Sequence, residues 1–311
     1  MALDQQFRAV LDQLTAAGAL PLVRGTAQET RAHYRTLAMS RRGPGYQPEV
    51  VASVEERTVD GPGGAVPVRI YQPTRQRGRV ITYLHGGGWV LGDLDTHDPV
   101  CRRLANTLGA TVVAVDYRLA PEHPHPAALD DTMAALRWTA TAYPGQPLVV
   151  AGDSAGASLA AGAALRARSD GPSLAAQLLV YPATDPAMRQ ASIRDNGDGY
   201  FLTAADMSWF YRQYLPDGTD RDELDLLHTS DLEGLPPAVV ATAEFDPLRD
   251  EGDAYAVRLR EAGVEVRHVP GPGLVHGYFA FLGLVEEAER RAEAVCAALD
   301  ELLRTGRRTA S

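Results

Sequence analysis

Ser154 stands between two glycines in the segment Gly152–Gly156, which reads G-D-S-A-G. An apolar run, 148–151, precedes this segment, and an alanine-rich stretch follows it. A G-x-S-x-G pattern at a strand-to-helix junction is typical of a hydrolase nucleophile, because the sharp turn exposes the serine hydroxyl. The flanking glycines let neighbouring backbone approach where a Cβ would collide. The pattern is short, so its interpretation as a nucleophile depends on other groups in the chain.

A second glycine-rich motif, His85–Gly88, follows the apolar segment 80–84. Consecutive glycines allow the backbone to come close to a developing oxyanion and to turn its N–H groups toward it. The alternative is a flexible turn, which is less favoured because the chain also carries the serine motif. The glycine run therefore predicts an oxyanion-binding loop.

A nucleophilic serine of this type requires an acid and then a histidine further along the chain. The acid should lie just past a strand end, where the carboxyl ends of parallel strands converge. Asp246 has this position after the predicted strand 238–243. Glu244 and Asp250 are the alternatives, although Asp250 has a structural explanation as the start of the next helix. Asp246 is thus the candidate acid.

The histidine should follow the last predicted strand, 264–269. His276 does so, in a stretch rich in glycine and proline that indicates a loop. His268 lies inside the strand and is interpreted as a sheet residue. His276 is therefore the candidate general base, and its protonation in mild acid should reduce activity.

The elements that must position these groups alternate along the chain. Continuous apolar strands separated by helical patterns indicate an α/β fold with a mainly parallel sheet covered on both faces. We expect eight strands, of which the first two form an antiparallel hairpin. The strands are predicted at 51–60, 66–71, 80–84, 111–115, 148–151, 177–181, 238–243 and 264–269, and the helices between and after them at 97–108, 126–141, directly after 154, 250–262 and 285–303.

Two regions lie outside this alternation. Helices predicted at 3–14 and 27–40 precede the first strand, and residues 186–234 form a long insertion with a helix near 203–214. An insertion of this length is usually a lid or binding element, although its aromatic rings could instead pack on a small core of their own. Substrate contacts are expected from apolar residues of the insertion and from those beside the motifs, namely Trp89, Tyr200, Phe201, Trp209, Phe210, Leu274 and Val275.

Composition limits the partners. The 311 residues carry a formal net charge of −10, which argues against nucleic acid. The sequence has neither a secretory signal pattern nor an apolar run of the ~20 residues a membrane helix needs, so we expect a cytoplasmic protein with no stable membrane association. Cys101 and Cys296 fit no metal or redox spacing. The segments 95–98 and 123–125 contain histidines but no evident third ligand, so no metal or cofactor is expected.

The motifs together resemble the hormone-sensitive-lipase-like carboxylesterases, the HGGG-type bacterial family IV of the α/β-hydrolase superfamily. The matching segments, in family order, are His85–Gly88, Asp116–Glu122, Gly152–Gly156, Asp246–Asp250 and His276-Gly277. The resemblance implies an α/β-hydrolase fold with a catalytic domain over 46–311 and a helical cap from residues 1–45 and the insertion at about 186–234. It also implies a Ser154, Asp246 and His276 triad, with oxyanion donors from the backbone of Gly87, Gly88 and Ala155. Tyr278 departs from the phenylalanine common after His-Gly, which affects no catalytic group.

The activity implied is that of a serine carboxylesterase acting on small-molecule esters with short to medium acyl chains. A deacetylase, lactonase or amidase acting on a specific metabolite is the alternative within the enzymes. A non-catalytic ligand receptor on the same fold is the alternative from another class, and it should lack a triad member. Family members often pair through the last strand and its helix, so the resemblance also implies a homodimer through residues 264–303.

Overall fold

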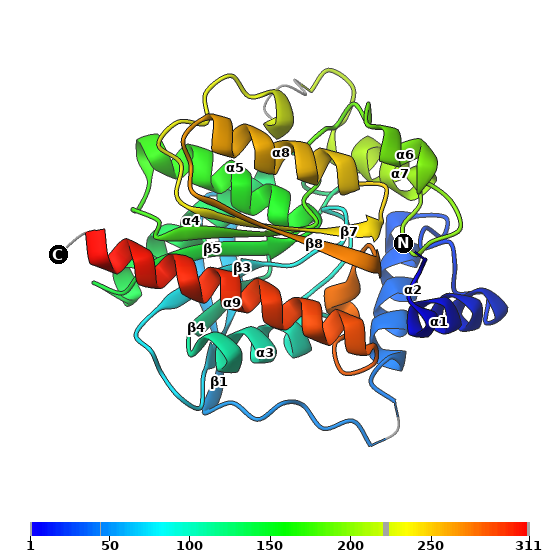
Figure 1. Ribbon diagram of the computed structural model, residues 1–311, viewed down its shortest axis with the longest axis horizontal. Coiled ribbons are helices and arrows are strands. Elements are labelled where there is room, and N and C mark those ends of the chain that lie inside the picture. Colours follow the sequence, from blue (N-terminus) through cyan, green and yellow to red (C-terminus); the bar gives the residue numbers. More distant parts are fainter. Residues whose placement is uncertain (1, 44, 220–223, 310–311) are drawn as a thin grey trace.

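The computed structural model describes residues 2–43, 45–219 and 224–309. These residues form an eight-stranded sheet in the order β1-β2-β4-β3-β5-β6-β7-β8 (Figure 1). The strands are β1 (Ser53–Gly61), β2 (Gly64–Gln72), β3 (Val80–Leu84), β4 (Thr111–Val115), β5 (Leu148–Asp153), β6 (Ala176–Val180), β7 (Ala238–Phe245) and β8 (Val266–Val275).

Strand pairing confirms the predicted sheet. The β1–β2 hairpin and the β2–β4 pair are antiparallel, and the remaining neighbours are parallel. Every residue of β3, β4, β5 and β6 is buried, as mainly apolar runs predict for strands covered on both faces. The hydrophobic core therefore lies on both sides of these central strands.

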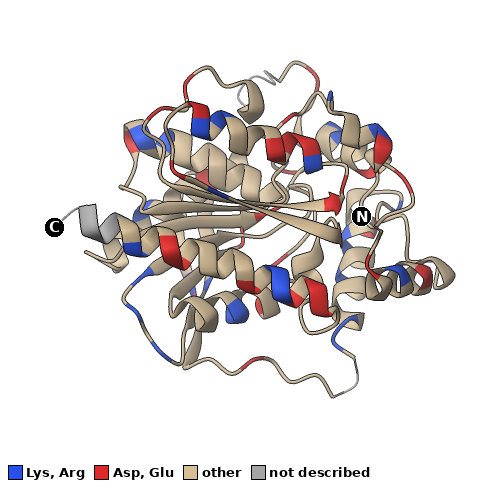
Figure 2. Ribbon diagram, viewed as in Figure 1, with Lys and Arg blue, Asp and Glu red and all other residues tan. Residues whose placement is uncertain are grey.

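Helices cover both faces of the sheet (Figure 1). Helices α4, α5 and α8 pack on one face, and α3 and α9 on the other. Charged residues lie mainly on helices and loops, and the strands are largely uncharged (Figure 2). No helix within the described residues is apolar over a length sufficient to span a bilayer. The bounds are α3 (Asp98–Leu108), α4 (Ala127–Ala142), α5 (Ala155–Asp170), α8 (Arg249–Glu261), η2 (Tyr278–Phe281) and α9 (Glu286–Thr309).

The two N-terminal helices, α1 (Gln5–Ala16) and α2 (Ala27–Ser40), lie beyond the carboxyl ends of the strands (Figure 1). Thr26 begins α2 with a capping box to Glu29. Arg31 fixes the helix to the α/β part of the chain, because its Nε donates to the carbonyl of Val90 (2.8 Å) and its Nη2 to that of Ala120 (2.7 Å). The N-terminal segment is thereby attached to the chain that follows the glycine-rich motif.

The insertion between β6 and β7 contains α6 (Ala191–Asp195), α7 (Ala204–Tyr214) and the short helix η1 (Leu226–His228). Helices α6 and α7 lie at the same end of the sheet as α1 and α2, whereas η1 packs against α8 (Figure 1). Thr203 caps the start of α7 and forms a capping box with Asp206. Two helical segments far apart in sequence therefore cover the strand ends.

The prediction for the last strand was too short. β8 continues beyond residue 269 to Val275, and its partners across β7 include Thr242 for Pro270 and Ala243 for Gly271. The glycines and prolines at 270–273 indicate a loop by type, but β8 is an edge strand of the sheet, where proline is tolerated. His276 consequently follows the strand directly.

Candidate active site

Ser154 lies at the turn from β5 into α5 with φ 55° and ψ −123°, a conformation that side chains other than glycine rarely adopt. The surrounding packing enforces this turn. A Cβ on Gly156 would lie 2.1 Å from the carbonyl oxygen of Leu84, and one on Gly152 would lie 2.3 Å from that of Gly156. The glycines are therefore required by close backbone contacts, and the turn presents the Ser154 hydroxyl to the cavity.

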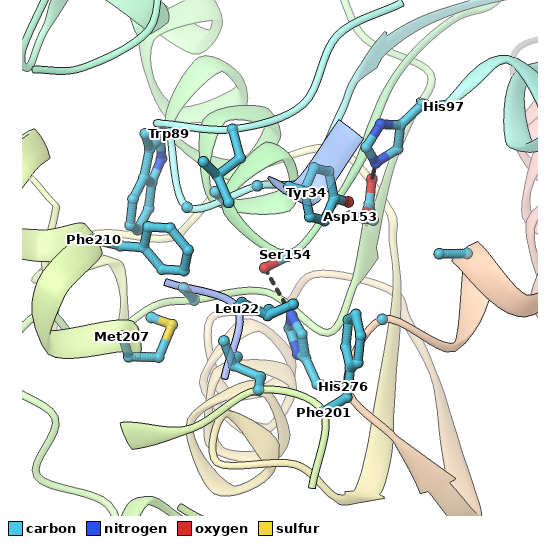
Figure 3. A pocket seen from close by; sticks show the side chains of 18 residues that line it. Leu22, Tyr34, Trp89, His97, Asp153, Ser154, Phe201, Met207, Phe210 and His276 are labelled. Carbon is cyan, nitrogen blue, oxygen red and sulfur yellow. Dashed lines mark hydrogen bonds and ion pairs between the residues drawn. The ribbon is translucent and has the colours of Figure 1, made fainter. Parts of the chain in front are cut away.

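The structure brings the three predicted side chains together in one hydrogen-bonded chain, and Figure 3 shows the bond between Ser154 and His276. His276 Nε2 lies 2.9 Å from Ser154 Oγ, and its Nδ1 lies 2.8 Å from Asp246 Oδ2. All three are buried, with Asp246 fully so. A nucleophile, a base within hydrogen-bond reach and a buried acid orienting the base are the arrangement of a serine hydrolase triad.

The loop after β7 holds the carboxylate of Asp246 in place. Asp246 Oδ1 accepts from the Leu248 N–H at 2.8 Å, which leaves Oδ2 for the histidine. The insertion also reaches this loop, because Asn196 Nδ2 donates to the backbone carbonyls of Glu244 (3.1 Å) and Asp246 (3.2 Å). The alternatives Glu244 and Asp250 have other partners: Glu244 accepts from the N–H of Gly273, and Asp250 from that of Ser192.

Gly87, Gly88 and Ala155 present backbone N–H groups beside Ser154. Gly87 and Gly88 adopt φ angles of 130° and 59°, and Ala155 is the first residue of α5, where N–H groups lack helical acceptors. Within the described part of the chain, none of the three N–H groups donates to a protein acceptor. The three line the same cavity as Ser154, so they are available to an anion there.

The side chain of Asp153, the residue before Ser154, holds the oxyanion loop in place. Asp153 Oδ1 accepts from the Gly86 N–H (2.9 Å) and the Tyr83 hydroxyl (2.7 Å), and His97 Nε2 lies 3.6 Å away. Burial acts to raise the pKa of this carboxyl, but His97 and the two hydrogen-bond donors outweigh it, and the pKa lies below its ordinary value. The carboxylate is therefore ionised and fixes the first residue of the glycine run.

His85 has a structural role in the same loop. Its ring stacks on Tyr117 with centroids 4.3 Å apart, and the Tyr117 hydroxyl donates to its carbonyl at 2.7 Å. Burial lowers the pKa of His85 to about 4, so the ring is neutral at pH 7. His85 thus shapes the loop without carrying a charge toward Ser154.

The cavity at Ser154 has a volume of about 50 Å³ and is mostly apolar. Trp89, Phe210 and Met207 lie on one side of Ser154, and Tyr34 and Phe201 on the other (Figure 3). The cavity has further lining residues from several segments, including the N-terminal segment, the oxyanion loop, the turn at Ser154, the insertion and the chain after His276. They are Leu22, Gly87, Gly88, Leu91, His97, Asp153, Ala155, Ala183, Leu202, Gly277 and Ala280.

Of the predicted substrate-contacting residues, Trp89, Phe201 and Phe210 line this cavity, and four others do not. Leu274 and Val275 are fully buried residues of the extended β8. Tyr200 packs on Phe245 at 5.1 Å between ring centroids. Trp209 lies about 100° around α7 from Phe210, and the two rings pack in an edge-to-face arrangement. The structure therefore places these four outside the cavity lining.

Several lining residues were not predicted. Met207 lies three residues before Phe210, so helical spacing could have identified it as part of the same face. His97 was considered only as a candidate metal ligand, and no local pattern connects it with Asp153. Leu22 and Tyr34 reach the cavity only because α2 is fixed over the strand ends, a contact that spacing does not reveal.

The ligand atoms of Asp185, Asp225 and His228 lie within 4.8 Å of one another, a spacing that a metal ion could use. Arg189 donates to the carboxylates of Asp185 (2.8 Å to Oδ1) and Asp225, and its Nη2 lies 2.9 Å from His228 Nδ1. Its guanidinium supplies positive charge within this cluster. The cluster joins Asp185, at the start of the insertion, to Asp225 and His228 near its end. None of these residues lines the cavity at Ser154.

Comparison with known proteins gives consistent matches. The family described as alpha/beta hydrolase fold matches residues 81–280. Carboxylesterase NlhH of Mycobacterium tuberculosis is 46% identical over 265 residues, covering 80% of this chain and 83% of the relative. Ethyl acetate hydrolase of Pseudomonas putida is 36% identical over 321 residues, covering 97% and 100%. The solved structure of a Pyrobaculum calidifontis esterase superimposes with a TM-score of 0.87 at 38% identity, covering 96% and 99%.

Proposed function

The chain belongs to the alpha/beta hydrolase family and is a carboxylic ester hydrolase like its named relatives, and we propose that it acts on short- to medium-chain esters through an acyl-serine intermediate. The observation that carries this proposal is the hydrogen-bonded chain from Ser154 through His276 to Asp246. Each group in that chain has the reach and the order that acyl transfer requires.

In acylation, the Ser154 oxygen attacks the ester carbonyl while His276 Nε2 takes the hydroxyl proton. The tetrahedral intermediate then collapses, and the imidazolium gives this proton to the departing alcohol. In deacylation, His276 takes a proton from water, and the resulting hydroxide adds to the acyl-serine carbonyl. Collapse releases the carboxylic acid and returns the proton to Ser154, so the enzyme is restored.

Asp246 keeps the imidazole in the productive tautomer. Its buried carboxylate accepts the Nδ1–H, which leaves Nε2 as the acceptor facing Ser154, and it stabilises the imidazolium once this forms. The N–H groups of Gly87, Gly88 and Ala155 receive the negative oxygen of the intermediate. Loss of one such donor typically raises the barrier by about 3–4 kcal/mol, which makes the position of the loop as important as that of the triad.

Short acyl chains are supported by the size of the cavity, about 50 Å³ between Trp89, Phe210 and the N-terminal helices. A relative named ethyl acetate hydrolase supports the same choice. The net charge of −10 disfavours adsorption to anionic lipid surfaces. Soluble small esters are therefore favoured over long-chain emulsions.

Amide, lactone and acetylated-metabolite substrates use the same acyl transfer and are the alternatives within this mechanism. A non-catalytic receptor is disfavoured because all three triad members are present at hydrogen-bond distance. Hydrolysis of 4-nitrophenyl acetate and butyrate by the wild type and Ser154→Ala tests the proposal. Equal rates in the two proteins contradict it, and failure of a fluorophosphonate probe to label Ser154 favours the receptor.

Three further proposals concern organisation. Residues 1–45 and the insertion at 186–234 act as a two-part cap over the catalytic domain 46–311, which their position at the strand ends supports (Figure 1). A cytoplasmic location is supported by the unpaired, buried Cys101 and Cys296. A homodimer through residues 264–303 is supported by the edge position of β8, and light scattering coupled to gel filtration measures it.

A further inference from the structure

Arg41, the residue that caps the end of α2, forms no salt bridge with an Asp or Glu in the described part of the chain. Its guanidinium lies over the rings of Phe201 and Phe281, at 5.1 and 4.5 Å from their centroids. Among the described residues, its buried Nε and Nη2 find no hydrogen-bond acceptor. Burial lowers the pKa of Arg41 from its ordinary value, yet an arginine stays protonated in proteins. A buried, charged donor without an acceptor is costly unless a ligand supplies one.

Arg41 borders a second cavity, of about 240 Å³, far larger than the roughly 10–15 Å³ that one ordered water requires. Arg42 lines it too, and no Asp or Glu belongs to the lining. Nearby carboxylates are already paired, with Asp93 and Asp95 held by Arg35 and Asp98 by Arg102. Within a chain of net charge −10, this cavity is a positively charged site.

The second cavity adjoins the cavity at Ser154. Ala280 lines both, and Phe201 lies between the Arg41 guanidinium and the catalytic cavity. On α2, Tyr34 faces the first cavity and Ala38 the second, and Arg41 continues the same face at helical spacing. One side of one helix thus runs from the catalytic cavity to the charged one.

The alcohol part of a bound ester must lie on the side of His276, because its imidazolium protonates the departing oxygen. Gly277 and Ala280, the residues just after it, form the wall that leads to Arg41. We propose that the second cavity is a carboxylate subsite, and that the enzyme prefers esters whose alcohol part carries a free carboxylate, such as acylated hydroxy acids. This inference rests on the proposed esterase function and deepens it.

The subsite adds binding and leaves the acyl transfer unchanged. The carboxylate pairs with the Arg41 guanidinium and neutralises its charge, and a charge-assisted pair of this kind is stronger than a hydrogen bond between neutral groups. The hydroxy acid then leaves with its carboxylate intact. Hydrogen bonds to charged groups of this strength correspond to about 10- to 100-fold in kcat/KM.

The test compares 4-acetoxybenzoate with its uncharged methyl ester. For each protein, the ratio of the two kcat/KM values is measured, so that any general loss of activity cancels. In Arg41→Met the ratio is expected to fall by about 10- to 100-fold, and in Arg41→Lys by less because the charge remains. Arg137→Met is the matched control, since Arg137 pairs with Asp170 at the surface and the ratio should not change.

An unchanged ratio in Arg41→Met overturns the inference, and so does a preference for a carboxylate on the acyl part, measured with the 4-nitrophenyl monoester of adipic acid. If the wild type hydrolyses neither acetoxybenzoate, the proposed function fails instead. The subsite is then judged by calorimetric binding of 4-hydroxybenzoate. Binding to the wild type that is weakened in Arg41→Met supports it, and equal or undetectable binding to both overturns it.

Discussion

The ring of Phe210, on helix α7 of the insertion, lies directly against Gly88 of the oxyanion loop. A Cβ added to Gly88 would come within 2.3 Å of the ring. The insertion therefore contacts the loop that we propose stabilises the transition state, and the same ring lines the cavity at Ser154. We expect acyl-chain length and oxyanion geometry to depend on this one contact.

This contact predicts a change of chain-length preference in Phe210→Ala. Removing the ring enlarges the small cavity beside Ser154, so the ratio of kcat/KM for 4-nitrophenyl hexanoate to that for the acetate should rise several-fold. Trp209→Ala is the matched control, because Trp209 is adjacent in sequence but does not line the cavity. Equal shifts in the two variants would mean that loosening of the insertion, and not the size of the cavity, governs the preference.

The conformation of Ser154 predicts that two substitutions which both abolish activity differ in their effect on stability. Ser154→Ala and Ser154→Gly should both lose on the order of 10⁴–10⁶-fold in kcat. Because φ is 55° at this residue, glycine relieves strain that alanine retains, and Ser154→Gly should exceed Ser154→Ala by about 1 kcal/mol in free energy of unfolding. Urea denaturation measures this difference. A more stable alanine variant would show that the turn is unstrained.

The acid of the triad can be distinguished from its neighbours. Asp246→Asn removes the acceptor that selects the histidine tautomer, so kcat should fall by about 10⁴-fold with little change in KM. Asp250→Asn alters a residue in the first turn of α8 whose carboxylate accepts from the N–H of Ser192, and kcat should remain within a few-fold of the wild type. A larger loss at Asp250 would transfer the role to that residue.

Asp116 predicts a pH dependence of stability. Burial raises its pKa to about 6, above the roughly 3.9 of aspartate in an unfolded chain. The stabilising contribution of the protonated form is therefore complete below the unfolded pKa and is lost as pH rises through about 6. Relative to the wild type, Asp116→Asn should gain about 1 kcal/mol more in free energy of unfolding at pH 8 than at pH 5.

Chemical denaturation at the two pH values measures this effect. Asp60→Asn, at an exposed position of β1, serves as the control and should show no such difference. An equal gain for Asp116→Asn at pH 5 and pH 8 would mean that the carboxyl titrates alike in the folded and unfolded chains.

The sequence predicts the turn at Ser154, the glycine run and the order of acid and base. Each of these follows a strand end, where the local backbone conformation restricts which residue types fit. It also predicts the sheet, since the apolar runs of β3 to β6 have no other stable place than between two layers of helices. Leu274 and Val275 were misplaced because the residue types at 270–273 indicate a loop, whereas pairing with β7 extends the strand.

The cavity wall was harder to predict for a different reason. Aromatic residues in the insertion attract attention by type, but only the rotation of α7 separates Phe210 from Trp209, and no periodicity fixes which face turns inward. The partnership of His97 with Asp153, and of Arg41 with the rings of Phe201 and Phe281, joins residues that are 56 positions or more apart in the chain or lie on different segments. Such contacts follow from tertiary packing alone.

Arg31 anchors α2 through two backbone carbonyls. The part of the cavity wall that belongs to the N-terminal segment is therefore held independently of the triad. Leu22 and Tyr34 line the cavity at Ser154, while the hydrogen-bonded chain is made by Ser154, His276 and Asp246. Part of the cavity wall and the reacting groups thus lie on different stretches of polypeptide. Exchange of the N-terminal segment between relatives, with the Arg31 anchor retained, would change the range of substrates and leave the acyl transfer unchanged.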